Sequence, residues 1–498
     1  MTAGLVANIV MNDFTRLSNL YKAWVEMVTI DDLLADPPGN SLLSRSPIER
    51  IAQTCLAPPF SVNQAARFAP PLLRMTLTLS NLNGLDRELK VVDDDSLPLV
   101  STFFDDRADF LLAAATGPDP KVRSVQDPAT WDLVRQCAIA SGSFPLAFPP
   151  YLIPRTKDEY ESQPPIARFE SQPSYIDGGT FNNQPIGEAV RLSRQTADFD
   201  EPRKYIFVNA NSDNSVFRDH DVMKAITGDF LHLLERVAQI IFNQARVSDL
   251  LQALQINEQI VWRQQFLDTL VGLIQTVSVT DQPVFLQRLR DLAGSMVEAS
   301  RARPGQRVGQ TSLEDLLQRT RSKYAAWLQQ IPAAAGQEVF TLIVFSIDHI
   351  ADLNQRIHID LFTIAPEPGE RLAGEQLAWF GGFFKLEYRQ YNFRRGRSLA
   401  HEILSQEDIL GPYPQEQGDQ PYQQYDIPDA WKDFPNEDLD DANRAKLSGQ
   451  LSQRIEVYVE NWLNQDLHLP RFLTRETVGI VLRWILNREI SKTLRKLS

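Results

Sequence analysis

One segment constrains the fold of this chain more than any other: Tyr175-Ile-Asp-Gly-Gly-Thr-Phe-Asn-Asn-Gln-Pro-Ile186. A short apolar strand ends here at the carboxylate of Asp177, and Gly178 and Gly179 then allow the backbone to turn sharply. Pro185 favours the first turn of a following helix. A carboxylate at the C-terminal edge of an α/β sheet lies where such folds place their active sites. Asp177 is therefore a candidate general base or metal ligand, although the Asp-Gly dipeptide alone favours a plain turn.

Around this segment, the first 210 residues alternate between strand-like and helix-like patterns. Strands are predicted at Leu73–Leu79, Tyr175–Ile176 and Tyr205–Val208. Apolar residues at helical spacing predict helices at Met1–Val10, Asp13–Leu34, Pro128–Ala140 and Pro185–Thr196. Turns are expected at Asn81–Gly84 and at the acidic pair Asp105-Asp106, and an irregular insertion at Arg155–Pro173. The alternation predicts an α/β sheet with covered faces and no strand before its first helix.

The remainder of the chain has mostly helical patterns. Helices are expected within Val222–Val277, Pro283–Arg301 and Ser312–Ile331, strands at Val339–Ile347 and Arg356–Ile364, and two closing helices around Val459 and Val481. The stretch Ser405–Lys446 is acidic and rich in Gln, Pro and Tyr, which is typical of an exposed connector. We therefore expect an α/β core at 1–215, a helical insertion at 216–335, a second part of the core at 336–404, a connector at 405–446 and C-terminal helices at 447–498.

The charge and the cysteines exclude several classes of function. The 50 Lys and Arg residues against 64 Asp and Glu give a net charge of −14, so the chain has no basic field for nucleic acid. Neither the two cysteines, Cys55 and Cys137, nor the 6 histidines have the spacing of zinc ligands or of a disulfide framework. No apolar run reaches the roughly 18 residues of a membrane span, and Met1–Val10 lacks the basic residues of a signal peptide. We expect a cytoplasmic protein without metal or cofactor, and peripheral membrane contact stays an open alternative.

Three groups of charged residues each allow two interpretations. Asp105, Asp106 and Asp109 resemble a divalent-cation cluster, but the adjoining turn residues favour a solvated loop. A basic cluster either pairs with the surplus carboxylates, which we favour, or meets acidic lipid headgroups; it comprises Arg389, Arg394, Arg395 and Arg397. The last expected helix carries a group of cations. We favour the interpretation that they are the cations usual near a helix C-terminus, and the alternative is that they contact a bilayer surface. They are Arg483, Arg488, Lys492, Arg495 and Lys496.

Four stretches follow one another in a characteristic order. They are Leu73–Leu79 with Asn81-Leu-Asn-Gly84, then Ala140-Ser-Gly-Ser-Phe-Pro-Leu-Ala-Phe-Pro-Pro150 before the Asp177 segment, then Leu377-Ala-Trp-Phe-Gly-Gly-Phe383, and finally Tyr388-Arg-Gln-Tyr-Asn-Phe-Arg-Arg-Gly-Arg397. Together they resemble the patatin-like phospholipase family, and the last two resemble a C-terminal block of its large bacterial members. Asn392 stands where that block usually has an aspartate.

The resemblance implies hydrolysis of lipid acyl esters by a Ser–Asp dyad. In the family a serine within Gly-x-Ser-x-Gly, on a strand-to-helix elbow, attacks the ester, an aspartate takes its proton, and backbone N–H groups stabilise the oxyanion. Asp177 matches the family's base, with Gly178 and Gly179 as the turn that aims it. The chain has no complete Gly-x-Ser-x-Gly. Only Met1-Thr-Ala-Gly4 aligns with it, so that Thr2 takes the serine position and Gly4 the position of the second glycine.

The first elbow glycine, the strand before it and the glycine-rich oxyanion loop have no counterpart in the sequence. We therefore expect an N-terminally truncated patatin-like core, either because the start was misplaced or because the gene itself is truncated. Threonine is also a poor elbow residue, since a β-branched side chain is penalised at positive φ. We expect a lipid acyl hydrolase that has little or no activity as this chain. The alternative is a non-catalytic relative that binds a protein partner or a membrane surface.

Overall fold

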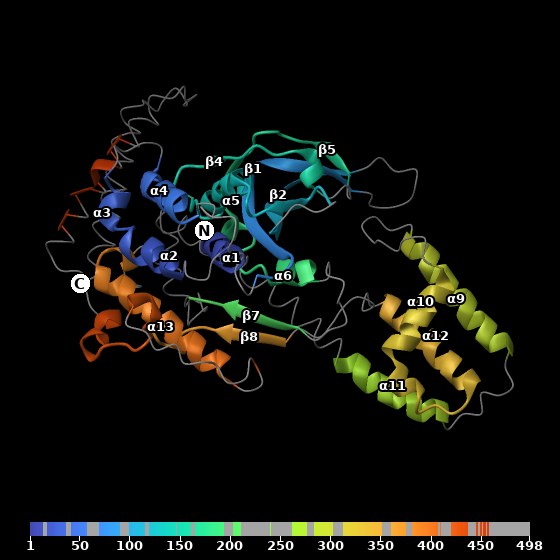
Figure 1. Ribbon diagram of the computed structural model, residues 1–498. Coiled ribbons are helices and arrows are strands. Elements are labelled where there is room, and N and C mark those ends of the chain that lie inside the picture. Colours follow the sequence, from blue (N-terminus) through green and yellow to red (C-terminus); the bar gives the residue numbers. More distant parts are fainter. Residues whose placement is uncertain are drawn as a thin grey trace, which may run out of the picture.

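The computed structural model describes residues 1–12, 17–35, 41–56, 69–89, 99–114, 119–145, 147–160, 165–193, 203–210, 240, 261–275, 283–301, 312–350, 360–374, 381–406, 409 and 420–436, with a few positions between 445 and 457. These ranges hold a central sheet, the helices that cover it, a second small sheet and a helical module (Figure 1).

The central sheet is mixed. Its strands follow the order β3-β2-β1-β6-β4, and β5 pairs with β1. Their bounds are β1 Leu73–Leu89, β2 Leu99–Ala113, β3 Val122–Ser124, β4 Tyr151–Leu152, β5 Ile166–Arg168 and β6 Ser174–Asp177. β2 and β3 run parallel, whereas the other pairs are antiparallel. The α/β class predicted from the sequence is confirmed.

The turn expected at Asn81–Gly84 is wrong, because β1 continues through it. The pairing of β1 with β2 shifts register between Ser80 and Leu85. Within this irregularity the side-chain oxygen of Asn81 accepts hydrogen bonds from the backbone N–H groups of Asn83 and Gly84, at 3.0 and 3.1 Å, and Gly84 has a φ of 74°. The residues that signal a turn therefore make a bulge, since β2 supplies a pairing partner on both sides of it.

The acidic turn expected at Asp105-Asp106 is also wrong, and so is the solvated loop for the three aspartates. All three lie inside β2, where Asp105 is paired with Ser80 and Asp109 with Thr76. The insertion expected at Arg155–Pro173 contains regular structure, namely a 3-10 turn, η3 (Lys157–Glu159), and strand β5.

One face of the sheet is covered by helices from two parts of the chain. α1 (Thr2–Asn12), α4 (Ser46–Cys55) and α5 (Pro128–Ala140) share one core with strand residues such as Leu79 and Phe110. Trp131 of α5 is fully buried in this core. The helices predicted at Met1–Val10 and Pro128–Ala140 are confirmed by α1 and α5.

The single helix expected over Asp13–Leu34 is wrong for the residues described there. α2 (Leu17–Tyr21) passes into a π-helical turn, η2 (Lys22–Glu26), and α3 (Ile30–Leu33) begins afresh. The hydroxyl of Thr29 accepts a hydrogen bond from the backbone N–H of Asp32 at 3.1 Å. This N-cap separates the two helices, because a capping residue has extended backbone angles that cannot continue the previous helix.

α6 (Ile186–Ser193) links the central sheet to a second sheet. β7 (Lys204–Val208) and β8 (Asp360–Ile364) pair in parallel, and both were predicted as strands. Ile186 and Val190 of α6 pack against Tyr205, Phe207 and Leu361 of this sheet. Residues 360–364 therefore return to the first part of the chain.

The helical module lies between β7 and β8 in the sequence. It contains a helix at residues 261–275, α9 (Pro283–Arg301), α10 (Leu313–Lys323), α11 (Ala325–Leu328) and α12 (Ala334–Ile350). α12 shows that the strand expected at Val339–Ile347 is wrong. That run is apolar at nearly every position, and periodicity alone cannot separate a buried helix from a buried strand there. Most of the helical pattern expected within Val222–Val277 lies outside the described residues.

The C-terminal block packs against the N-terminal helices. α13 (Leu386–Leu404) packs beside η2, and the buried guanidinium of Arg389 donates to the carbonyl oxygens of Val25 and Phe383 at 2.7 and 3.0 Å. Part of the expected exposed connector also packs on α13, since Phe434 and Trp431 cluster with Tyr388. Nearly all of the closing helices, including their basic face, lie outside the described residues.

Candidate active site

Asp177 occupies the last position of β6, and its backbone is held from two sides. It lies opposite Leu79 of β1. The Asp177 N–H donates to the carbonyl oxygen of Ser143 at 2.9 Å, and the hydroxyl of Ser80 donates to the carbonyl oxygen of Asp177 at 2.8 Å. The loop after α5 and strand β1 thus fix the backbone from which the carboxylate projects.

The two glycines after Asp177 are required by close approach rather than by unusual backbone angles. A Cβ at Gly178 would lie 2.1 Å from the carbonyl oxygen of Thr78, so the chain passes against the backbone of β1. A Cβ at Gly179 would lie 2.7 Å from the side-chain oxygen of Asn183 and 3.2 Å from Oδ1 of Asp177. The N–H of Gly179 donates to that same Oδ1 at 2.8 Å. The Asp-Gly-Gly sequence therefore packs a carboxylate, an amide and two backbone segments into one tight turn.

Burial raises the pKa of the Asp177 carboxyl group above its ordinary value. The hydrogen bond from Gly179 and the positive charge of the N-terminal amine oppose that rise without cancelling it. A carboxylate that is destabilised by burial is a stronger base than an exposed one, which is what general base catalysis requires.

The start of α1 lies close to this carboxylate. Thr2 is the first residue of α1 and is exposed. The amine of Met1, one residue earlier, lies 3.4 Å from the carbonyl oxygen of Ala138 and interacts electrostatically with Asp177. Gly4 allows α1 to approach α5, because a Cβ there would lie 3.2 Å from the side chain of Val134. The N-terminal amine thus lies within electrostatic range of Asp177, although the two groups are far apart in the sequence.

A buried polar cluster behind β6 was missed by the sequence reasoning. The carboxylate of Asp106 is buried and accepts hydrogen bonds from the hydroxyl groups of Tyr160 and Tyr175, both at 2.9 Å. Burial raises the pKa of both tyrosines, and the neighbouring Asp106 raises it further. Arg155 lies over both tyrosine rings, with its guanidinium carbon 5.0 and 6.0 Å from their centroids. Only pairing across the sheet brings these residues together, so no local pattern could have revealed the cluster.

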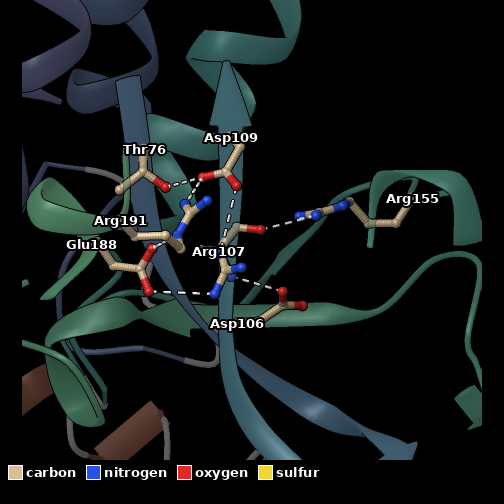
Figure 2. Close-up of polar contacts among 7 residues, drawn as sticks. All are labelled: Thr76, Asp106, Arg107, Asp109, Arg155, Glu188 and Arg191. Atoms are coloured by element: carbon tan, nitrogen blue, oxygen red, sulfur yellow. Dashed lines mark hydrogen bonds and ion pairs between the residues drawn. The ribbon is translucent and has the colours of Figure 1, made fainter. Parts of the chain in front are cut away.

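Figure 2 shows a second polar network, which links α6 to β1 and β2. Arg191 of α6 forms ion pairs with Asp109 and Glu188, both at 2.6 Å, and Arg107 pairs with the same two carboxylates at 3.4 and 3.3 Å. The hydroxyl of Thr76 also donates to Asp109. Burial acts to raise the pKa of Asp109, but the Thr76 bond and Arg191 outweigh it and hold that pKa below its ordinary value. The network anchors the helix that directly follows the Asp177 turn.

These contacts bear on the cation hypothesis for the aspartates of β2. Asp106 accepts hydrogen bonds from two tyrosine hydroxyl groups, and Asp109 contacts a threonine hydroxyl group and an arginine. These contacts indicate that both carboxylates have structural roles within the sheet. Among the described residues, no group of three or more His, Cys, Asp or Glu side chains is arranged to hold a metal ion.

Intramolecular contacts hold three arginines of the basic cluster of α13, and the favoured pairing with carboxylates is found for Arg395. Arg395 forms an ion pair with Glu370 at 2.5 Å. Arg394 lies over the ring of Trp431, with its guanidinium carbon 4.7 Å from the centroid. Arg389 bonds backbone carbonyls rather than carboxylates. In the same helix, Asn392 makes two hydrogen bonds with the backbone of Ala373, at 2.9 and 3.0 Å.

Comparison with known proteins finds a family model that matches part of the chain. The model of the patatin-like phospholipase family matches residues 10–190, a span that holds β1, β2, α5 and the Asp177 turn. The chain therefore carries a patatin-like phospholipase domain within this span. The matched span includes Asp177, Gly178 and Gly179, and it begins after Thr2 and Gly4. Searches of curated proteins and of solved structures gave no match. No helix among the described residues is long and apolar enough to cross a bilayer.

Proposed function

We propose that this protein is a patatin-like lipid acyl hydrolase whose activity is strongly impaired. The observation that carries the proposal is the half-buried Asp177 carboxylate, held by the Gly178–Gly179 turn and within electrostatic range of the N-terminal amine before α1. In the proposed reaction the Thr2 hydroxyl attacks the acyl carbonyl while Asp177 accepts its proton. The free N–H groups at the start of α1 favour the developing oxyanion. The tetrahedral intermediate collapses and the alcohol of the ester leaves with the proton from Asp177. Asp177 then takes a proton from water, which attacks the acyl-enzyme, so that the carboxylic acid is released and the proton returns to Thr2.

Impairment follows from the residue in the nucleophile position. A β-branched side chain is disfavoured at the strained backbone angles of a nucleophile elbow, whereas serine is tolerated there better. The alternative function, a non-catalytic domain that binds a protein partner or a membrane surface, is favoured by this same threonine. For the organisation of the chain we propose the division given above, with β7 and β8 supporting a core that continues after the helical module. Two unpaired, buried cysteines suit the cytoplasmic location we propose.

The test compares hydrolysis of p-nitrophenyl butyrate and octanoate by the wild-type chain and by four variants. We expect a low wild-type rate, a rise of about tenfold or more in Thr2→Ser, and loss of that rate in Thr2→Ala and Asp177→Asn. Asp119→Asn is the matched control, since Asp119 lies in an exposed turn and an asparagine keeps its role as an acceptor for Lys121 N–H. Equal rates in Thr2→Ser and Thr2→Ala would contradict Thr2 as the nucleophile. A rate unchanged in Asp177→Asn would contradict the dyad.

A further inference from the structure

The helix at residues 261–275 has apolar side chains on two of its sides. On one side four residues are buried in the core of the helical module, namely Leu267, Leu270, Val271 and Ile274. On another side Trp262, Phe266, Thr269 and Leu273 follow one another at intervals of four, three and four residues, which places them in one line along the helix. Trp262 and Leu273 are each 56% exposed. We call these four residues the outer stripe.

The outer stripe is bulky at its N-terminal end and open at its C-terminal end. The Trp262 ring stacks on the Phe266 ring, with centroids 5.6 Å apart and an interplanar angle of 18°. At the other end Gly272 adjoins Leu273, and a Cβ built on Gly272 would meet no side chain within 4 Å, its direct neighbours apart. Glycine weakens a helix by about 1 kcal/mol relative to alanine. Among the described residues no contact requires a glycine there, so its presence indicates that another molecule approaches this backbone closely.

The charges of this helix do not hinder a contact through the outer stripe. Its two charged residues are Arg263 and Asp268. Arg263 is buried and forms an ion pair with Asp348 at 3.3 Å. Asp268 accepts a hydrogen bond from the indole N–H of Trp327 at 2.9 Å, and the helical repeat turns it away from the stripe. Copies of a chain with a net charge of −14 repel one another, so they approach most easily through an uncharged surface of this kind.

We propose that the outer stripe pairs with the same stripe of a second copy of this chain, as two antiparallel helices related by a two-fold axis. Antiparallel pairing places Trp262 of each copy against Leu273 and Gly272 of the other. The bulky end of one stripe thus fills the open end of its partner, and the two-fold axis repeats this contact. A second copy fits because it presents both the indole that fills the space at Gly272 and a stripe without charge. The pairing does not depend on the catalytic proposal.

Sedimentation equilibrium of the full chain over a wide range of protein concentration tests this pairing. The wild type should approach twice the mass of one chain as the concentration rises. Trp262→Gln should raise the dissociation constant of the dimer about tenfold or more, because a buried tryptophan is a frequent hot spot of an interface. Phe285→Gln is the matched control, since Phe285 is an exposed aromatic residue of α9 in the same helical module. It should dimerise as the wild type does.

A second variant, Gly272→Gln, separates the proposed packing from an effect on the fold. Glutamine suits a helix better than glycine, so the urea midpoint should not fall. The dimer should nevertheless weaken about tenfold or more, because the new side chain occupies the space that Trp262 of the second copy needs. Gly396→Gln is the matched control, because Gly396 is an exposed glycine of α13 whose Cβ would likewise meet no side chain within 4 Å.

Three outcomes would contradict the proposal. A wild type that stays monomeric over the whole concentration range would overturn it and would leave the stripe to a different protein. Association that is unchanged in Trp262→Gln, or that is lost equally in Phe285→Gln, would exclude the outer stripe as the contact. Association that is weakened in Trp262→Gln but unchanged in Gly272→Gln would contradict the antiparallel arrangement.

Discussion

The replacement Asn392→Asp restores the aspartate that is usual at this position in the C-terminal block that the sequence resembles. In the structure the Asn392 side chain both accepts from the N–H of Ala373, at 2.9 Å, and donates to its carbonyl oxygen, at 3.0 Å. An aspartate keeps the first bond and loses the second, and it places a carboxylate oxygen against the Ala373 carbonyl. The neighbouring turn has little room to adapt, because a Cβ at Gly374 would lie 2.4 Å from the backbone of Gly381.

The expected loss of stability follows from these two bonds. A hydrogen bond contributes about 0.5–1.5 kcal/mol net, and an acceptor left without its donor costs about 1–3 kcal/mol. Because Asn392 is half-buried, we expect the lower part of this range, about 1–2 kcal/mol. Local opening of the segment around Ala373 should then become roughly 5–30 times more frequent.

Hydrogen exchange followed by mass spectrometry measures this opening in peptides that cover Ala373 and α13. At low pH a protonated aspartate regains a donor, so the deficit should shrink between pH 7 and pH 4.5. The stability deficit of the variant shrinks at low pH because the new carboxyl group would have a raised pKa in the folded state. Its contribution to stability is therefore present at low pH and is lost as the pH rises. Gln264→Glu is the control, an amide-to-carboxylate change at an exposed position of the helix at 261–275. Equal exchange in both variants, or a deficit that is the same at both pH values, would refute the reasoning.

Three further predictions concern the candidate site and the core. Gly178→Ala should lower the urea midpoint by at least the equivalent of about 1–3 kcal/mol, because its Cβ would meet the Thr78 carbonyl oxygen; an unchanged midpoint would contradict the close approach. Asp177→Asn should raise the urea midpoint at pH 7, and this gain should disappear below about pH 4. Burial raises the pKa of Asp177, so its ionisation destabilises the fold at pH 7, whereas at low pH the carboxyl group is protonated and carries no such penalty. Cys55 and Cys137 should not react with Ellman's reagent until the protein is denatured, because burial raises the pKa of both thiols, that of Cys137 to about 12; prompt labelling of the native chain would contradict this.

Elements with local signals were predictable from the sequence. α5 begins where Pro128 follows Asp127, whose carboxylate accepts a hydrogen bond from the N–H of Ala129 at 3.0 Å, and both preferences are local. The strand that ends at Asp177 and the helix after it were predictable for the same reason. By contrast, Asn81–Gly84 carries turn residues, and only pairing with β2 makes it part of a strand.

What the sequence alone determined is the Asp-Gly-Gly turn and its likeness to one family, because the glycines and the carboxylate act through their immediate neighbours. Tertiary structure decided what surrounds that turn. It placed the start of α1 near Asp177, closed Asp106 between two tyrosines, and left Phe104 and Phe181 exposed side by side. Each of these arrangements depends on contacts between segments that are far apart in the chain. A local sequence pattern cannot predict such contacts, because their free energies depend on both segments.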